Sequence, residues 1–167
     1  MTIPFDQLPD STRAWVYTSN RLLTDHEVAS ITKRLAHFTD EWSSHGAPLN
    51  AASIVLDNSV IVIAVENGWD AASGCSIDKS VGVLKAIEQE LNVSFFDRLT
   101  LLFKENQTAS VAFVAVSALK KRIQENEMPL DALFVNTQID SIKGIKTGIW
   151  NDINSSWLVK SMSARIR

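Results

Sequence analysis

The sequence predicts a mixed α+β fold, and three observations support this prediction. Short runs of β-branched and aromatic residues predict strands, apolar residues that recur at three and four positions predict helices, and turn-prone residues separate paired strand runs. The first six elements follow the order β-α-β-β-α-β, which is typical of a split βαβ, ferredoxin-like sheet with both helices on one face. With 167 residues and 46% hydrophobic content, the chain is long enough to bury a core, and we expect a single domain over residues 1–167.

The first strand is expected at residues 13–19, where aromatic and β-branched residues alternate. Thr24 and Glu27 then have the spacing of a capping box, which satisfies free backbone donors at a helix start. The helix that follows carries one apolar stripe, made of Val28, Ile31, Leu35, Phe38 and Trp42. We expect it to end near residues 44–48, which include Gly46 and Pro48.

Two hairpins and a second helix complete the predicted sheet. Apolar runs at residues 51–56 and 60–65 are separated by Asp57-Asn58-Ser59, and runs at 99–103 and 109–116 by five polar residues. Between the hairpins, apolar residues at helical spacing predict a helix that follows the turn at residues 74–78. The core is therefore expected over 13–116, followed by a C-terminal β-α-β extension at 117–167. The face of the sheet without helices would be covered by that extension, by a second copy in a homodimer, or by a ligand.

Composition excludes several classes of protein. One cysteine cannot form an intrachain disulfide, no secretory signal follows Met1, and the longest apolar run is far too short to cross a bilayer as a helix. These features predict a cytoplasmic protein with no membrane association. The basic residues of the C-terminal third are scattered, so they do not favour nucleic-acid binding.

Three segments resemble a family of small uncharacterised bacterial proteins that are often labelled "ABC transporter ATPase". They are residues 42–49 (WSSHGAPL), 72–81 (ASGCSIDKSV) and 95–98 (FFDR). The resemblance implies a shared fold. It does not support the label, because a phosphate-binding loop needs the pattern Gly-x-x-x-x-Gly-Lys-Ser/Thr. The nearest string, residues 144–148, has a Lys-Thr pair but lacks the required preceding glycine and spacing. We therefore do not expect a P-loop ATPase.

Cys75 is the residue that most suggests catalysis. It precedes Ser76, the predicted N-cap of the second helix, and the free amides of a helix start favour a thiolate. A thiol enzyme also needs a base, and His45 in the loop after the first helix is the best candidate among three histidines. The alternatives are structural: a small buried cysteine in a tight turn, and a histidine that caps a helix C-terminus.

The remaining candidate residues predict binding. Gly74, Ser76 and Asp78 form the turn around the cysteine, and Trp69 precedes it outside any periodic run. Arg98 would pair with a nearby acid or with an anionic ligand. His26 and His37 are too far apart along a helix to chelate a metal together, and no metal or other cofactor is expected.

Because no catalytic constellation stands out, the sequence favours a non-catalytic module that binds a small ligand or a partner protein. The alternative is a thiol-dependent enzyme that uses Cys75 as nucleophile and His45 as base.

Overall fold

The structure is a computed structural model that describes residues 4–66 and 72–163. It divides into two compact units, the described residues of Met1–Phe96 with Thr137–Thr147, and those of Asp97–Asn136 with Gly148–Arg167. Each unit combines helices with an antiparallel sheet, which confirms the α+β class. The expected boundary between residues 116 and 117 does not coincide with this division, because the chain enters the second unit at residue 97.

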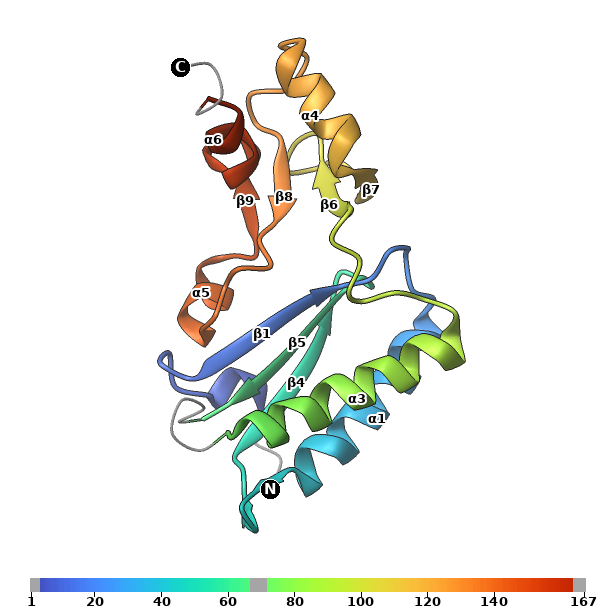
Figure 1. Ribbon diagram of the computed structural model, residues 1–167, viewed down its shortest axis with the longest axis vertical. Coiled ribbons are helices and arrows are strands. Elements are labelled where there is room, and N and C mark those ends of the chain that lie inside the picture. Colours follow the sequence, from blue (N-terminus) through green and yellow to red (C-terminus); the bar gives the residue numbers. More distant parts are fainter. Residues whose placement is uncertain (1–3, 67–71, 164–167) are drawn as a thin grey trace. The chain divides into compact units, whose positions relative to one another are not determined.

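The first unit is built on a three-stranded antiparallel sheet in the order β1-β5-β4 (Figure 1). Its elements are η1 (Phe5–Gln7), β1 (Arg13–Thr18), α1 (Asp25–Glu41), β2 (Ser43–Ser44), β3 (Ala47–Pro48), β4 (Ala51–Leu56), β5 (Val60–Val65), α3 (Gly74–Leu91) and α5 (Ile142–Thr147). The register Ala51↔Val65 to Leu56↔Val60 confirms the predicted first hairpin.

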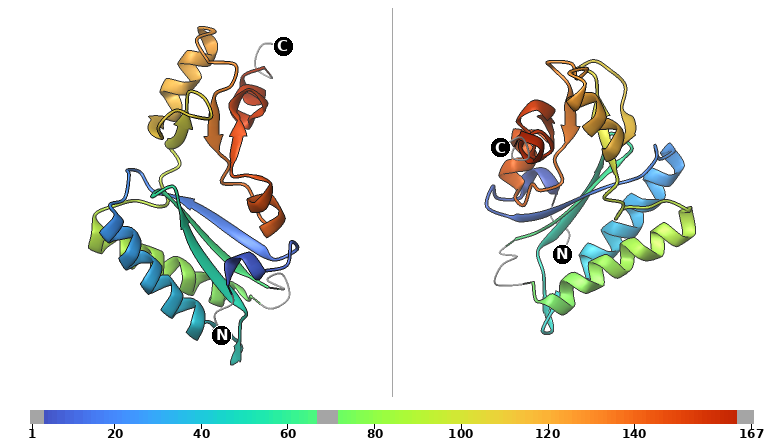
Figure 2. Two further views of the ribbon diagram at one scale, coloured as in Figure 1. Left: turned by 180° about the vertical axis from the view of Figure 1, so that it is seen from behind. Right: turned by 45° about the horizontal axis from the view of Figure 1, so that its top comes forward.

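Helices α1 and α3 lie side by side across one face of this sheet, as both views in Figure 2 show. The predicted capping box at Thr24 and Glu27 is present at the start of α1. The predicted apolar stripe packs into the core between the helices and the sheet, where Leu35 and Leu84 are fully buried. The apolar periodicity of both helices therefore predicted their buried faces correctly.

The opposite face of the sheet is also buried. Residues alternate along a strand, so Val60, Val62 and Ala64 of β5 point away from the helices, and all three are inaccessible to solvent within the chain. The homodimer that the sequence predicts through an uncovered sheet face stays a prediction.

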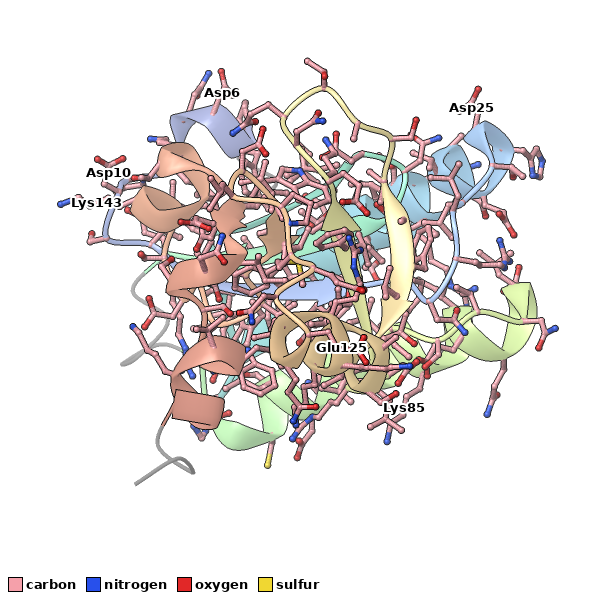
Figure 3. The ribbon with its side chains drawn as sticks, turned by 90° about the horizontal axis from the view of Figure 1, so that it is seen from above. Asp6, Asp10, Asp25, Lys85, Glu125 and Lys143 are labelled. Carbon is pink, nitrogen blue, oxygen red and sulfur yellow. The ribbon has the colours of Figure 1, made fainter. Side chains whose placement is uncertain are left out.

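The segment around α5 is tied to the N-terminal residues of the first unit. Backbone hydrogen bonds join Ala14 N–H to Asp140 and Ile142 N–H to Thr12. The Lys146 ammonium donates to the Asp10 carboxylate at 2.8 Å, and this contact lowers the pKa of Asp10. Figure 3 shows Asp10 and Lys143 next to one another at this edge. Residues about 130 positions apart thus form one local structure.

Arg21 links three elements of the first unit. Its guanidinium makes two hydrogen bonds to the Glu27 carboxylate, at 3.0 and 2.7 Å, and a third to the Leu91 carbonyl at the end of α3. Glu27 also accepts from the Thr24 backbone as part of the capping box. Arg21, together with that backbone donor, lowers the pKa of Glu27 to about 2. Stability conferred by this network therefore depends on an ionised Glu27.

The second unit has its own four-stranded antiparallel sheet, in the order β7-β6-β8-β9. Its elements are β6 (Thr100–Lys104), β7 (Ala112–Ala115), α4 (Val116–Gln124), β8 (Leu133–Val135), β9 (Trp150–Asp152), η2 (Ile153–Ser155) and α6 (Trp157–Ser163). The β6–β7 pairing confirms the predicted second hairpin. Phe103, Leu119 and Phe134 belong to a core shared by α4, α6 and the sheet.

The ferredoxin-like order is not confirmed, because the sixth element pairs elsewhere. In a split βαβ sheet, the strand after the second helix would join β1, β4 and β5. Here β6 instead forms hydrogen bonds with β7 and β8, with the register Phe103↔Ala112 and Phe103↔Phe134. The physical reason is that β6 shares an apolar face with β8 and α4, which provides it with a separate core.

Candidate functional site

The turn around Cys75 forms the first turn of α3, and its capping differs from the prediction. The N-cap is Ser73, three residues before the predicted Ser76, and its hydroxyl accepts from the Ser76 backbone N–H. Ser76 is buried, and its hydroxyl donates to the Ser73 carbonyl at 2.8 Å. Both serines can cap a helix, so sequence alone could not distinguish them. Ser76 therefore has a structural role inside the helix start.

Cys75 is exposed, so the alternative of a small buried cysteine is wrong. Gly74 and Asp78 are exposed as well, and a Cβ at Gly74 would meet nothing within 4 Å. None of the described residues forms a hydrogen bond with the Cys75 sulfur. The thiol is therefore accessible, and no described side chain contacts it through a hydrogen bond.

His45 lies in a two-residue turn and does not cap a helix. Helix α1 ends at Glu41, and β2 and β3 then form a small hairpin whose turn is His45-Gly46, with φ of 50° and 80°. These positive φ values are typical of a hairpin turn, in which glycine is favoured at the second position. His45 is exposed and makes no hydrogen bond with any described residue. The expected Cys75–His45 pair is therefore not in hydrogen-bond contact.

The hairpin and the start of α3 are nevertheless joined. The Ser44 and Ser73 hydroxyls are 3.2 Å apart, and the Ser73 backbone N–H donates to the Ser44 hydroxyl. Two of the segments that carry the family resemblance thus come together here, although their exposed candidate residues, His45 and Cys75, make no contact that meets hydrogen-bond criteria.

Two other predicted binding residues do not join this cluster. Trp69 lies outside the described residues. Arg98 is exposed, belongs to the second unit, and forms no ion pair with any residue in the described ranges. Arg98 and the Cys75 turn therefore belong to different units.

A groove lies between α1 and α3 in the first unit. We call it the helix groove; its volume is about 550 Å³. It is lined by Arg34, His37, Phe38, Glu41, Trp42, Ser43, Lys79, Gly82, Val83 and Ala86. Small-molecule sites have volumes of about 300–1,000 Å³ and mostly apolar walls, so the helix groove has the size and lining of such a site.

Aromatic rings form part of the groove and fix its position. The Trp42 ring is 4.8 Å from the Phe38 ring and 6.5 Å from that of Trp15, measured between centroids. Its indole N–H donates to the Ser76 carbonyl at 2.9 Å, which joins the end of α1 to the start of α3. Trp42 therefore holds the two helices at the spacing that leaves the groove open.

Some charged residues of the groove contact another ionisable side chain, whereas Lys79 does not. Arg34 pairs with Glu90, and the His37 ring lies 3.5 Å from the Glu41 carboxylate. Lys79 makes no ion pair or hydrogen bond with any of the residues that the structure describes. It is thus the cationic group in the lining that remains available to a ligand.

Sequence reasoning missed this groove, although it named several of its residues for other reasons. Phe38 and Trp42 were expected only as members of the buried stripe, and Lys79 only as part of the resemblance. The available signal was Gly82, a glycine in the middle of a predicted helix, where it costs about 1 kcal/mol relative to alanine. A glycine at such a position usually has a reason in packing or in function.

Residues 4–66 and 72–163 contain no group of three or more His, Cys, Asp or Glu side chains that could hold a metal ion. No helix in these ranges is both long and apolar enough to cross a membrane.

No protein-family model, curated protein or solved structure matches the chain. Membership of the bacterial family suggested by the three segments therefore stays a prediction, and the function must be argued from the geometry of the first unit.

Proposed function

We propose that the protein is a non-catalytic binding module and that its helix groove holds a small, largely apolar molecule. The observation that carries this proposal is the groove itself, with a volume of about 550 Å³ and a lining that includes Phe38, Val83 and Ala86. Burying apolar ligand surface there provides roughly 25 cal/mol per Å². A cytoplasmic location belongs to the same proposal and is supported by the single, exposed thiol, which forms no intrachain disulfide.

Gly82 supports this proposal independently. A Cβ at this position would meet no described atom within 4 Å, so packing in the described structure does not require a glycine. A helix-interior glycine nevertheless costs about 1 kcal/mol relative to alanine. A ligand that lies against the α3 backbone provides a reason for the missing side chain, because glycine permits close approach.

Binding can be tested with N-phenyl-1-naphthylamine, a neutral apolar dye whose fluorescence rises in apolar surroundings. We expect saturable binding to the wild-type protein. Gly82→Leu is expected to weaken binding at least tenfold, because the new side chain fills the groove at a position where a Cβ has open space. The measurement is a fluorescence titration of both proteins.

Lys85→Leu is the matched control, because it places the same side chain on α3 outside the groove lining. Lys85 is exposed, and Figure 3 labels it at the margin of the molecule. Equal binding by wild type and Lys85→Leu, with loss in Gly82→Leu, supports the proposal. No saturable binding to the wild type, or full binding by Gly82→Leu, contradicts it.

Thiol chemistry at Cys75 is the second candidate, favoured by one observation. The sulfur is exposed in the first turn of the 18-residue helix α3, where free backbone amides favour anions. In this alternative, His45 would act as base after a rearrangement of its hairpin turn, since the two residues form no hydrogen bond here.

Alkylation separates the two candidates. A binding module is expected to react completely with iodoacetamide at Cys75, at the rate of a small free thiol at the same pH, and His45→Ala should not change that rate. A wild-type rate at least tenfold above the free thiol, reduced by His45→Ala, would instead support the enzyme. Cys75→Ser controls for reaction at other side chains.

A further inference from the structure

The charges of the helix groove specify its ligand more narrowly. We propose that the ligand is a small amphipathic anion, with an apolar body on the groove floor and one negatively charged head group bound by Lys79. This inference rests on the proposed function, because it assumes that the groove is the binding site.

Arg34 and Glu41, two charged residues of the groove lining, each contact another ionisable side chain. Arg34 contacts Glu90, and Glu41 contacts the His37 ring at 3.5 Å. Lys79 makes no such contact with the described residues. Lys79 is therefore the charged side chain of the lining that has no contact with a described partner, and an anionic head group would complement it.

Lys79 lies one helical turn from both Gly82 and Val83 on α3, so all three side-chain positions share one face of the helix. A ligand body that covers Gly82 and Val83 would bring its head group near the Lys79 ammonium. The lysine side chain is flexible and ends in a point charge, so it can bind a carboxylate, a sulfonate or a phosphate. These ligands share one anionic head group.

Glu41 is the acidic residue that an anion would meet in the same groove. The Trp42 indole contacts the Ser76 carbonyl, which places the end of α1 near the first turns of α3. Glu41 therefore lies toward the Lys79 end, and its charge opposes an anionic head group. The His37 ring lies 3.5 Å from this carboxylate. Removing this carboxylate in Glu41→Gln should strengthen anion binding.

The test compares two dyes that share one ring system. N-phenyl-1-naphthylamine is neutral, whereas 1-anilinonaphthalene-8-sulfonate adds a sulfonate. We expect Lys79→Met to raise the dissociation constant of the sulfonate about fivefold at low salt, which is the upper range for an exposed ion pair. The constant of the neutral dye should stay unchanged. Lys79→Arg should retain sulfonate binding, and Glu41→Gln should tighten it about two- to fivefold, by the same ion-pair magnitudes.

Lys85→Met is the control for nonspecific attraction of the sulfonate to a positive surface, and it should change neither constant. Salt provides a second readout, because added salt should weaken sulfonate binding to wild type more than to Lys79→Met.

The two proposals fail in different ways. If the neutral dye does not bind, the proposed function is wrong. If the neutral dye binds in a Gly82-dependent manner but Lys79→Met leaves the sulfonate constant unchanged, only the anion inference is overturned. Equal losses in Lys79→Met and Lys85→Met would overturn it as well.

Discussion

Replacing Trp42 with alanine is expected to lower the free energy of unfolding by about 3–5 kcal/mol, the usual cost of deleting a buried tryptophan. The indole is only 2% exposed and packs against Phe38 and Trp15. Its removal leaves a cavity where α1 meets the hairpin and also removes the hydrogen bond to the Ser76 carbonyl. Urea denaturation of wild type and variant measures the difference.

Trp42→Phe separates packing from the hydrogen bond. It keeps most of the ring volume but loses the N–H that contacts Ser76, so we expect a smaller cost of about 1–2 kcal/mol. Trp157→Ala is the matched control, because that tryptophan is 41% exposed and its removal should cost clearly less than that of Trp42. A loss below about 1 kcal/mol in Trp42→Ala would contradict the role of Trp42 as the joint between the helices.

Glu27→Gln is expected to destabilise the protein by about 2 kcal/mol at pH 7, with the difference disappearing as the pH falls toward 2. The Glu27 side chain is 15% exposed and receives two hydrogen bonds from Arg21. Its pKa in the folded protein is about 2, below the ordinary 4.5. Stability from a lowered carboxyl pKa is present above the ordinary value and is lost as the pH falls through the folded one.

The measurement is urea denaturation of wild type and Glu27→Gln between pH 7 and pH 2. Solvent at Arg21, which is 38% exposed, keeps the expected difference below the full value that the pKa shift alone implies. The matched control is Glu90→Gln, which removes the ion pair with Arg34 at a carboxylate that is 58% exposed and should cost less than about 1 kcal/mol. A pH-independent difference between wild type and Glu27→Gln would contradict the ionic role of Glu27.

Local features of the fold could be predicted because they depend on near neighbours in the sequence. The Thr24 and Glu27 capping box, the stripe through Leu35 and the β4–β5 hairpin each follow from spacing within a few residues. These patterns also identified the correct buried faces of α1 and α3, because helical periodicity brings the apolar residues onto one stripe.

The partner of β6 could not be predicted in the same way. Its residues suit any antiparallel neighbour, and the choice of β8 depends on Phe134, thirty-one positions after Phe103. The element order alone favoured the ferredoxin-like arrangement, but a strand joins the sheet whose apolar face completes its core. That choice depends on tertiary packing.

In the candidate site too, the sequence predicted features that depend on near neighbours and missed those that depend on tertiary packing. The sequence identified the turn around Cys75 as distinctive. In the structure, the Cys75 thiol is exposed and the N-cap of α3 is Ser73, not the predicted Ser76. The sequence did not identify the helix groove, because a groove depends on the spacing of two helices, and 32 residues of the chain separate α1 from α3. Only Gly82 marked it, and a glycine in a helix has several explanations.

The most direct test of the helix groove as the binding site is an amide chemical-shift titration of the ¹⁵N-labelled protein with N-phenyl-1-naphthylamine. We expect saturable chemical-shift changes on the facing turns of α1 and α3, with the largest changes near Phe38, Gly82 and Val83. The amide shifts of β6 to β9 should not change. Saturable shifts confined to the second unit, or the absence of any saturable shift, would contradict the helix groove as the binding site.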